Sequence, residues 1–511
     1  MTPTGFHRSI LAFSAMAGSI FAMAETPALI NRIQNAALPV NRVATMEYSH
    51  NPATMLYSDS VSLSSIAVSA DYSSLDRAVM EQTGTGSRLL SIGANSYRKL
   101  STKMAVWGNA SFTTGSYRNI KWSDCIDYEY VAPYVLGDDT GGNLTTQCYK
   151  FSGGIAKSVN QWTVGAQARY RAEIAYRDHD PRIKTIVSDL DVTIGASLEV
   201  AGKRILGVNG GISVYNQNCD LDFYNPVNDI NTYTLTGMGT YYRRFMGNTN
   251  KNSGYNSIGF SAGAQFLSTD KSGFKASVCV ESYRMKQQLR NFNNITLGFT
   301  DNLTVSASAS YRWNVNNRLT IEPLLTGFFS HRKGTENLFG NSTGASYDKI
   351  GSNSFYRHNK FDAAIALPIQ WTAGGKTYIT IAPHSSFSAN EERYATPLRK
   401  TDVLHIVPGV MASLSMNRGA WLWDMAINGE YRLSHSQEPI WTDLDTTSAL
   451  GACQLNNYSM LDAESCKGDI KINVTRHMGP VALNGSIFYS LQHYRSIGNT
   501  NIAGISVGVI F

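Results

Sequence analysis

The sequence predicts an all-β protein, a transmembrane antiparallel β-barrel of about 18 strands, within a range of about 14 to 20. Three observations support this fold class. Apolar and polar side chains alternate along segments of about 10 to 15 residues. No apolar run beyond the amino terminus approaches the roughly 20 residues that a membrane-spanning helix needs. Charged residues make up only 16% of the chain and tyrosine occurs 27 times, which favours a lipid-facing wall over the surface of a cytosolic enzyme.

The first 24 residues have the pattern of a secretory signal peptide. His7 and Arg8 precede an apolar stretch from Ile10 to Phe21, which is followed by Ala22-Met23-Ala24. An A-x-A triplet after a short apolar core predicts cleavage before Glu25. We therefore expect the mature chain to begin in an oxidising envelope compartment. The alternative, an amino-terminal anchor helix, is disfavoured because the apolar core is too short to span a bilayer.

Residues 25–59 precede the first predicted strand and form a separate periplasmic segment. Leu29, Ile30, Ile33, Ala37 and Leu38 recur at the spacing of one helix face. We expect this segment to enter the lumen of the barrel as a plug.

Residues 60–511 make up the predicted barrel, and Gln161 to Ala175 is its clearest strand. Val164 and Ala168 alternate there with Arg169, Arg171 and Glu173. Successive side chains of a strand point to opposite faces, so one face is apolar and the other charged. A soluble β-sandwich has the same period, but strands this long exceed those of globular sheets and suit a tilted membrane strand.

Strand ends and connections give the predicted barrel its orientation. Trp162 and Tyr176 stand at the two ends of one strand, as in the aromatic girdles of membrane barrels. Short connections, such as 316–317 and 417–419, are predicted periplasmic turns. The long connections at 117–147, 216–254, 333–356 and 436–465 are predicted external loops.

The final segment, Asn501 to Phe511, also alternates and ends on an aromatic residue. A terminal aromatic of this kind resembles the assembly signal that the β-barrel assembly machinery reads. We therefore place the protein in the cell outer membrane, in contact with outer-membrane lipid and lipopolysaccharide, and assign Phe511 as the membrane-assembly signal.

Six cysteines in an exported chain are disulfide candidates. Cys125 and Cys148 flank one predicted external loop, while Cys453 and Cys466 lie within another, so we predict a disulfide in each pair. Cys219 and Cys279 remain, and the sequence does not decide whether they form a disulfide across the barrel mouth.

Charged side chains on the polar face of the predicted strands, which faces the lumen, indicate the function of the lumen. They carry both signs, which suits a water-filled passage for polar solutes in which they set selectivity. A salt-bridged network that fills a narrow barrel is the alternative. The candidate lumen residues are Arg169, Arg171, Glu173, Lys275, Glu281, Arg312, Asp424, Glu430 and Arg432.

Other function classes have little support in the sequence. His435-Ser436 and Asp178-His179-Asp180 are the nearest matches to a hydrolase site, but neither has a third partner, so we expect no enzyme. No phosphate-binding, zinc or calcium motif occurs, and we expect neither cofactor nor metal. A net charge of +6, spread along the chain, gives no argument for nucleic-acid binding.

Short motifs resemble known barrel families. Asn51-Pro52-Ala53, the stretch from Pro133 to Gly142, and Asp180-Pro181-Arg182 with Ser188-Asp189-Leu190 are similar to those of a family of uncharacterised outer-membrane barrels. That family is often encoded beside TonB-dependent receptors. The resemblance implies an accessory role in nutrient or metal uptake, or a non-conducting barrel that docks such a receptor or a surface lipoprotein.

The Asn-Pro-Ala start also resembles the long-chain fatty-acid transporters, which carry hydrophobic compounds through a plugged barrel. A charged lumen argues against that conduit here.

Overall fold

The computed structural model describes residues 29–58, 62–200, 203–225, 227, 230–247, 249, 251–270, 272–343 and 346–511. The predicted signal peptide and the first residues of the predicted periplasmic segment lie outside this set. Among the described residues, no helix has the length and apolar character needed to cross a membrane.

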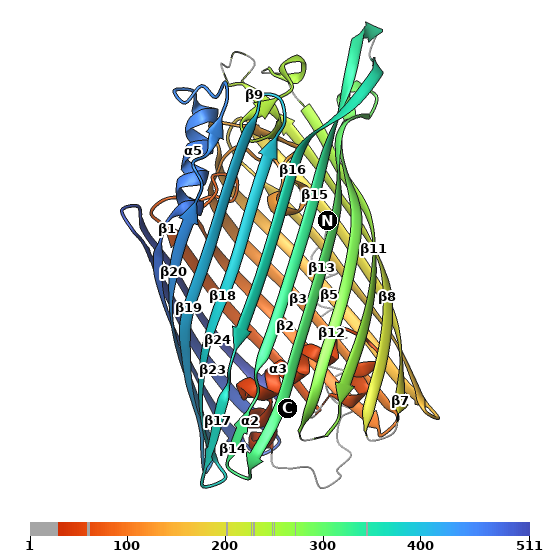
Figure 1. The fold of residues 1–511 in the computed structure, drawn as a ribbon, viewed down its shortest axis with the longest axis vertical. Coiled ribbons are helices and arrows are strands. Elements are labelled where there is room, and N and C mark those ends of the chain that lie inside the picture. Colours follow the sequence, from red (N-terminus) through yellow and green to blue (C-terminus); the bar gives the residue numbers. More distant parts are fainter. Residues whose placement is uncertain are drawn as a thin grey trace, which may run out of the picture.

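The chain forms one closed antiparallel β-barrel of 18 strands, which confirms the predicted fold class (Figure 1). Two of the 18 strands are each interrupted once and therefore carry two labels. One consists of β14 and β15, and the other of β16 and β17. Pro323 and Pro368 lie at the two breaks, where an N–H is missing from the ladder.

The strands of the wall have the following bounds: β1 (Leu63–Leu75), β2 (Gly86–Ser101), β3 (Met104–Ile120), β5 (Gly142–Val159), β6 (Trp162–Tyr176), β7 (Arg182–Val200), β8 (Arg204–Asp222), β11 (Lys251–Ser268), β12 (Gly273–Leu289), β13 (Ile295–Asn316), β14 (Leu319–Ile321), β15 (Leu324–Thr343), β16 (Ser346–Ala366), β17 (Ile369–Ala373), β18 (Thr377–Tyr394), β19 (Arg399–Arg418), β20 (Trp421–Ser436), β22 (Ser465–Met478), β23 (Val481–Tyr494) and β24 (Gly498–Ile510).

The last strand closes the barrel against the first. β24 pairs antiparallel with β1, and Phe511 continues this ladder by exchanging both backbone hydrogen bonds with Ser64, at 2.9 and 2.8 Å. Closure removes the open sheet edge, which is a requirement for a sheet that crosses lipid.

The outer wall is apolar, as the alternation predicts. Ile194 and Val507 each expose 63% of their surface on the outside of the barrel. The tryptophans Trp162, Trp313 and Trp371 are more than half exposed and stand near the periplasmic turns. They make up one aromatic girdle at a lipid interface.

Three of the four long connections, and the short connection after β12, contain further elements. The β3–β5 connection, residues 121–141, is called the inner loop below and contains α4 (Tyr128–Val131) and β4 (Val135–Asp138). The β8–β11 connection contains β9 (Thr232–Gly237), β10 (Thr240–Tyr241) and η3 (Arg243–Phe245). β21 (Ile440–Trp441) and α5 (Ala449–Asp462) follow β20, and η4 (Arg290–Phe292) follows β12.

These connections turn into the barrel and pack in a hydrophobic core at its external end. Trp122 and Val135 of the inner loop pack with Leu450 of α5 against Tyr215 and Tyr255 of the wall. β4 and β9 pair in a separate small sheet, which ties two of the connections together.

The prediction of a loop at 333–356 is wrong. β15 and β16 continue as a paired hairpin through most of this stretch, because cross-strand pairs extend as far as Thr343 and Ser346. The last partner of β15 on β13 is the pair Gly298 with Glu336, so beyond it the hairpin is a two-stranded ribbon. Figure 1 shows this ribbon rising above the rest of the barrel.

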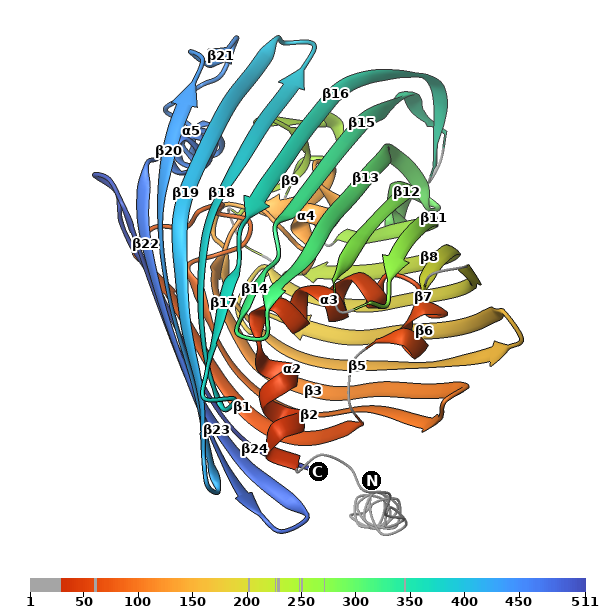
Figure 2. The same ribbon diagram turned by 60° about the horizontal axis from the view of Figure 1, so that its bottom comes forward.

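The segment before the first strand lies inside the periplasmic end of the barrel (Figures 1 and 2). It contains α2 (Leu29–Ala37), α3 (Pro39–Ser49) and η2 (Thr54–Tyr57). Helix α2 contacts β19, β20, β22 and β23, whereas η2 contacts β3, β5, β6 and β7. The segment therefore crosses the opening from one side of the wall to the other, as Figure 2 shows.

Asn51-Pro52-Ala53 anchors this segment to the wall. Asn51 is fully buried and donates from Nδ2 to the carbonyl oxygens of Val208 and Ala196, at 3.1 and 3.5 Å. A β-carbon at Gly195 of the wall would overlap Asn51 Oδ1, so the close approach requires glycine there. Packing against the wall thus explains the motif.

Candidate functional site

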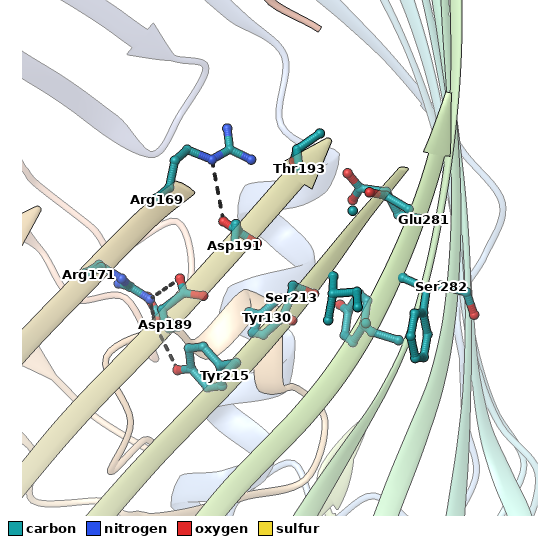
Figure 3. Close-up of a pocket in the computed structure, with 17 residues that line it drawn as sticks. Tyr130, Arg169, Arg171, Asp189, Asp191, Thr193, Ser213, Tyr215, Glu281 and Ser282 are labelled. Atoms are coloured by element: carbon teal, nitrogen blue, oxygen red, sulfur yellow. Dashed lines mark hydrogen bonds and ion pairs between the residues drawn. The ribbon is translucent and has the colours of Figure 1, made fainter. Parts of the chain in front are cut away.

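A polar pocket of about 360 Å³ lies on the inner wall under the inner loop (Figure 3). Strands β6, β7, β8, β11 and β12 supply its floor, and Asp127 and Tyr130 of the inner loop cover it. Three of the predicted lumen residues line it, namely Arg169, Arg171 and Glu281.

Strand register explains why the charges meet at this pocket. Arg169 is opposite Asp191, and Arg171 is opposite Asp189, in the antiparallel ladder of β6 and β7. Directly opposite side chains lie on the same face and within contact distance. Arg169 Nε is 3.6 Å from Asp191 Oδ2, and Arg171 Nη2 is 3.4 Å from Asp189 Oδ2.

Arg171 is the centre of a carboxylate network. Its two terminal nitrogens donate to both oxygens of Asp127, at 3.0 and 2.5 Å, in the bidentate geometry that gives arginine pairs their strength. Arg171 Nη1 also donates to Glu173 Oε2 at 3.2 Å. Since Tyr215 donates to Asp127 at 2.8 Å, the inner loop is fixed to the wall at this point.

A second carboxylate holds the inner loop further along the wall. Asp124 is fully buried and accepts from Ser253 Oγ at 2.5 Å and from Tyr255 OH at 2.7 Å. Burial raises the pKa of Asp124 to about 7, against the lowering effect of these two hydrogen bonds. The thiols of Cys125 and Cys219 lie in the same buried core.

Buried ion pairing also fixes the end of the inner loop. Arg177 Nη2 is 2.7 Å from Asp138 Oδ2, and both side chains are almost wholly buried. The other oxygen of Asp138 accepts from the backbone of Gly141 at 2.7 Å, and Arg177 Nε donates to Pro181 O. The satisfied geometry offsets the cost of burying both charges.

Two charged groups of the pocket remain accessible from the lumen. The Arg169 side chain is 60% exposed, and its only ion pair with a described residue is the 3.6 Å contact with Asp191. Glu281 is exposed and makes no hydrogen bond or ion pair with any described residue. Beside them, Tyr130 and Tyr283 stack with ring centroids 4.7 Å apart. The pocket thus offers a cation, an anion and aromatic surface to a polar solute.

Lys275 and Arg312, predicted as lumen residues, belong to a different, buried cluster. Both pair with Glu322, which has no exposed side-chain surface, at 3.5 and 2.7 Å. Arg312 also donates to Asn41 Oδ1 at 3.3 Å and to the carbonyl oxygen of Val40, at the start of α3. This cluster fastens the amino-terminal segment to the wall.

The remaining predicted lumen residues lie on β20, and the structure separates them. Asp424 lines a small cavity beside α2 and α3 with Arg42 and Lys471. Glu430 contacts His384 Nε2 at 3.3 Å. Arg432 donates from Nε to the carbonyl oxygen of Ala463, at the end of α5, at 2.9 Å. The nine candidates therefore lie in separate places: at the pocket and its Arg171 network, in the buried Glu322 cluster, beside α2 and α3, against His384 of the wall, and at the end of α5.

The predicted disulfides are not present, since all six cysteines are free: Cys125, Cys148, Cys219, Cys279, Cys453 and Cys466. The barrel wall separates one predicted pair, because Cys453 is buried on α5 whereas Cys466 is exposed beside the outward-facing Tyr431. Local packing holds Cys125 in the core of the inner loop, where Ser123 Oγ is 3.1 Å from its sulfur. The spacing of the cysteines along the chain does not show on which side of the wall each side chain lies.

The pairs considered for hydrolysis have other contacts. His179 Nε2 is 3.2 Å from the carbonyl oxygen of Gly141, and Asp180 accepts from the backbone of Tyr224 and Asn225. His435 is exposed on β20. Among the described residues, no three His, Cys, Asp or Glu side chains are grouped so as to hold a metal ion.

Sequence reasoning missed several residues of the pocket. Asp189 and Asp191 stand on the polar face of a predicted strand, so alternation could have found them. Asp127, Tyr130 and Tyr283 could not be assigned, because only folding brings the inner loop under the mouth and against β12.

Fold and site together define a transmembrane β-barrel whose lumen is crossed at one end by its own amino-terminal segment and at the other by inward-folded loops. Residues 52–511 match the model of a family of unknown function, DUF6850, and the chain belongs to that family. No curated protein sequence matches the chain.

Several solved outer-membrane proteins have a similar barrel. The siderophore receptor PiuA from Acinetobacter baumannii has a TM-score of 0.39 and 6% identity, over 88% of this chain and 82% of the receptor. The copper transporter OprC has a TM-score of 0.39 and 8% identity, over 87% and 81% of the two chains. BauA, the ferric preacinetobactin receptor from Acinetobacter baumannii, has a TM-score of 0.38 and 8% identity, over 87% and 80%.

Proposed function

We propose that this protein admits small polar solutes across the outer membrane, and that its amino-terminal segment and inner loop keep the passage closed at rest. In this proposal the pocket under the inner loop is the selectivity site. Neither metal nor cofactor takes part, and no chemical step occurs.

The observation that carries the proposal is the accessibility of Arg169 and Glu281 in a polar lumen. A wall that only filled space would pair and bury its charges, as Glu322 does with Lys275 and Arg312. Accessible charges of both signs in a water-filled passage instead act on passing ions and zwitterions. The stacked Tyr130 and Tyr283 add a surface for an aromatic or sugar ring.

Conductance in planar bilayers tests the proposal. The full chain is compared with the double variant Asn51→Ala, Asp127→Ala, which removes the side chains that anchor the amino-terminal segment and the inner loop to the wall. We expect rare openings for the unaltered chain and frequent openings for the variant. If neither protein conducts, although both give the same β-sheet spectrum, the lumen is not a passage and the proposal is wrong.

Selectivity is tested in the conducting variant under a salt gradient. Glu281→Gln removes an accessible negative charge and should shift the reversal potential towards anion preference, whereas Arg169→Gln should shift it towards cation preference. Glu438→Gln, an exposed residue of the β20–β21 connection, is the matched control and should leave the potential unchanged. If Glu281→Gln and the control shift the reversal potential equally, the pocket does not line the passage.

A second candidate function is favoured by the projecting β15–β16 ribbon. Its outer part is two-stranded, and Leu338 and Ile350 expose 38% and 71% of their surface. We propose as this alternative that the ribbon docks an outer-membrane partner, such as an uptake receptor. Removing residues 338–351 should then abolish co-purification of a partner from native membranes, while the unaltered barrel retains it. Recovery of the barrel alone in both cases contradicts docking.

A further inference from the structure

A second cavity, of about 430 Å³, lies between helix α3 and the inner wall formed by strands from β8 to β18. Val43, Met46 and Glu47 of α3 form one side of it. Figure 2 shows α3 crossing the barrel opening near β12 and β13, which supply part of the opposite side. The volume falls in the range of small-molecule sites.

Glu47 gives this cavity an unsatisfied negative group. The residue is only 3% exposed, and its Oε2 has no hydrogen-bond partner among the described residues. Its backbone is held in place, since Gln265 Nε2 donates to the Glu47 carbonyl oxygen at 2.9 Å. A carboxylate buried without a partner is costly, so a cation that enters the cavity gains from pairing with it.

The other lining groups do not supply that cation. No lysine or arginine is among the described residues that line the cavity, and the lining histidine, His50, is exposed and makes no ion pair with a described residue. Asp362, the second carboxylate of the lining, already pairs with Lys360 at 3.2 Å. Ser277 and Ser308 bond to each other at 2.7 Å. Glu47 therefore stands out as the group available for a charged ligand.

The remaining surface decides which kind of cation fits. Val43, Met46 and Phe328 make much of the lining apolar. A hard metal ion is usually held by several carboxylates, and the described residues contain no group of three His, Cys, Asp or Glu side chains that could hold one. An organic ammonium satisfies both features, because its charged end pairs with Glu47 and its apolar body contacts the rest of the lining.

We propose that this cavity is a binding site for a small organic ammonium compound, a primary amine on a short apolar body. The ammonium donates to Glu47 Oε2, and the ligand joins α3 to the wall. The site is separate from the pocket under the inner loop and does not depend on solute passing through the barrel.

Binding is measured by isothermal titration of the full chain in lipid nanodiscs, with empty nanodiscs as the blank. The probes are n-pentylammonium, the neutral 1-pentanol and the anionic hexanoate. We expect saturable binding of pentylammonium only. Glu47→Gln should weaken it by about 10- to 100-fold, the effect of losing one charge-assisted hydrogen bond. Asp362→Asn should have a smaller effect, because Asp362 is already paired.

Glu438→Gln, on the exposed β20–β21 connection, is the control for loss of one negative charge and should bind like the unaltered chain. Hydrogen exchange adds a second measurement, in which pentylammonium should slow exchange across 39–49 in the unaltered chain and not in Glu47→Gln. Equal binding of pentylammonium and pentanol, or an unchanged affinity in Glu47→Gln, would overturn the proposal. A chain that conducts nothing can still bind the amine, so the two proposals fail separately.

Discussion

Gly195→Ala should release the amino-terminal segment from the wall. Gly195 lies on the inner face of β7, where the added methyl group would occupy the position of Asn51 Oδ1. Asn51 would have to move, and its Nδ2 would lose the carbonyl oxygens of Val208 and Ala196. The strand itself tolerates alanine, so the perturbation falls on the contact between segment and barrel.

The size of the effect follows from these contacts. Two neutral hydrogen bonds contribute about 1 kcal/mol each, and overpacking of a tight contact costs about 1 kcal/mol or more. A loss of about 3 kcal/mol raises the detached fraction of the segment roughly 100-fold, since each 1.4 kcal/mol is a factor of ten.

Hydrogen exchange across residues 29–58, followed by mass spectrometry, measures that fraction. Gly210→Ala is the matched control, because its methyl group would have no neighbour closer than 3.7 Å. Exchange in the segment should speed up about 100-fold in Gly195→Ala and stay unchanged in Gly210→Ala. Equal protection in both variants would refute the assignment of Asn51 as the anchor.

Three further outcomes are expected. Burial raises the pKa of Asp124 to about 7, from about 3.9 in the unfolded chain, so the contribution of Asp124 to holding the inner loop is full below about pH 4 and is lost as the pH rises through about 7. Amide exchange across 121–141 should therefore speed up over this pH range, and Asp124→Asn should remove that pH dependence. Asp138→Ala should lower the free energy of unfolding by about 3 to 5 kcal/mol, because it leaves Arg177 charged and buried without its partner. The midpoint of urea unfolding measures the loss, and the double variant Asp138→Ala, Arg177→Met should recover part of it. Phe511→Ala should reduce the amount of folded barrel in the outer membrane, seen as less protein in membrane fractions at equal synthesis, whereas an unchanged amount would exclude an assembly role.

The two closures of the lumen differ in how they are held. The inner loop is fixed by three carboxylates, the buried Asp124 and Asp138 and the half-buried Asp127, each bonded to the wall or to Arg177 at its rim. The amino-terminal segment is fixed by short apolar contacts, such as those of Ile33, and by amide and guanidinium hydrogen bonds. Change in pH should act on the inner loop through Asp124, because burial raises the pKa of this carboxyl to about 7.

The sequence by itself determined the wall. Period-two alternation in segments such as 161–175 fixes which side chains face lipid, because neighbouring positions of a strand point to opposite faces. Strand length and the Trp162 position then identify the membrane, and the terminal alternation ending on Phe511 identifies the closing strand. These are local properties, and each can be read from a dozen consecutive residues.

Only the tertiary structure decided what occupies the lumen. Arg171 and Lys275 look equivalent as polar-face charges, yet one joins the pocket and the other is buried against Glu322. The difference arises from Asp127 of the inner loop, which has no periodic pattern, and from Glu322 at the break between β14 and β15. Cysteine spacing misled for the same reason, since Cys453 and Cys466 are near in sequence but lie on opposite sides of the wall. Contacts between segments far apart in the chain depend on how the barrel closes, and closure is a property of the whole fold.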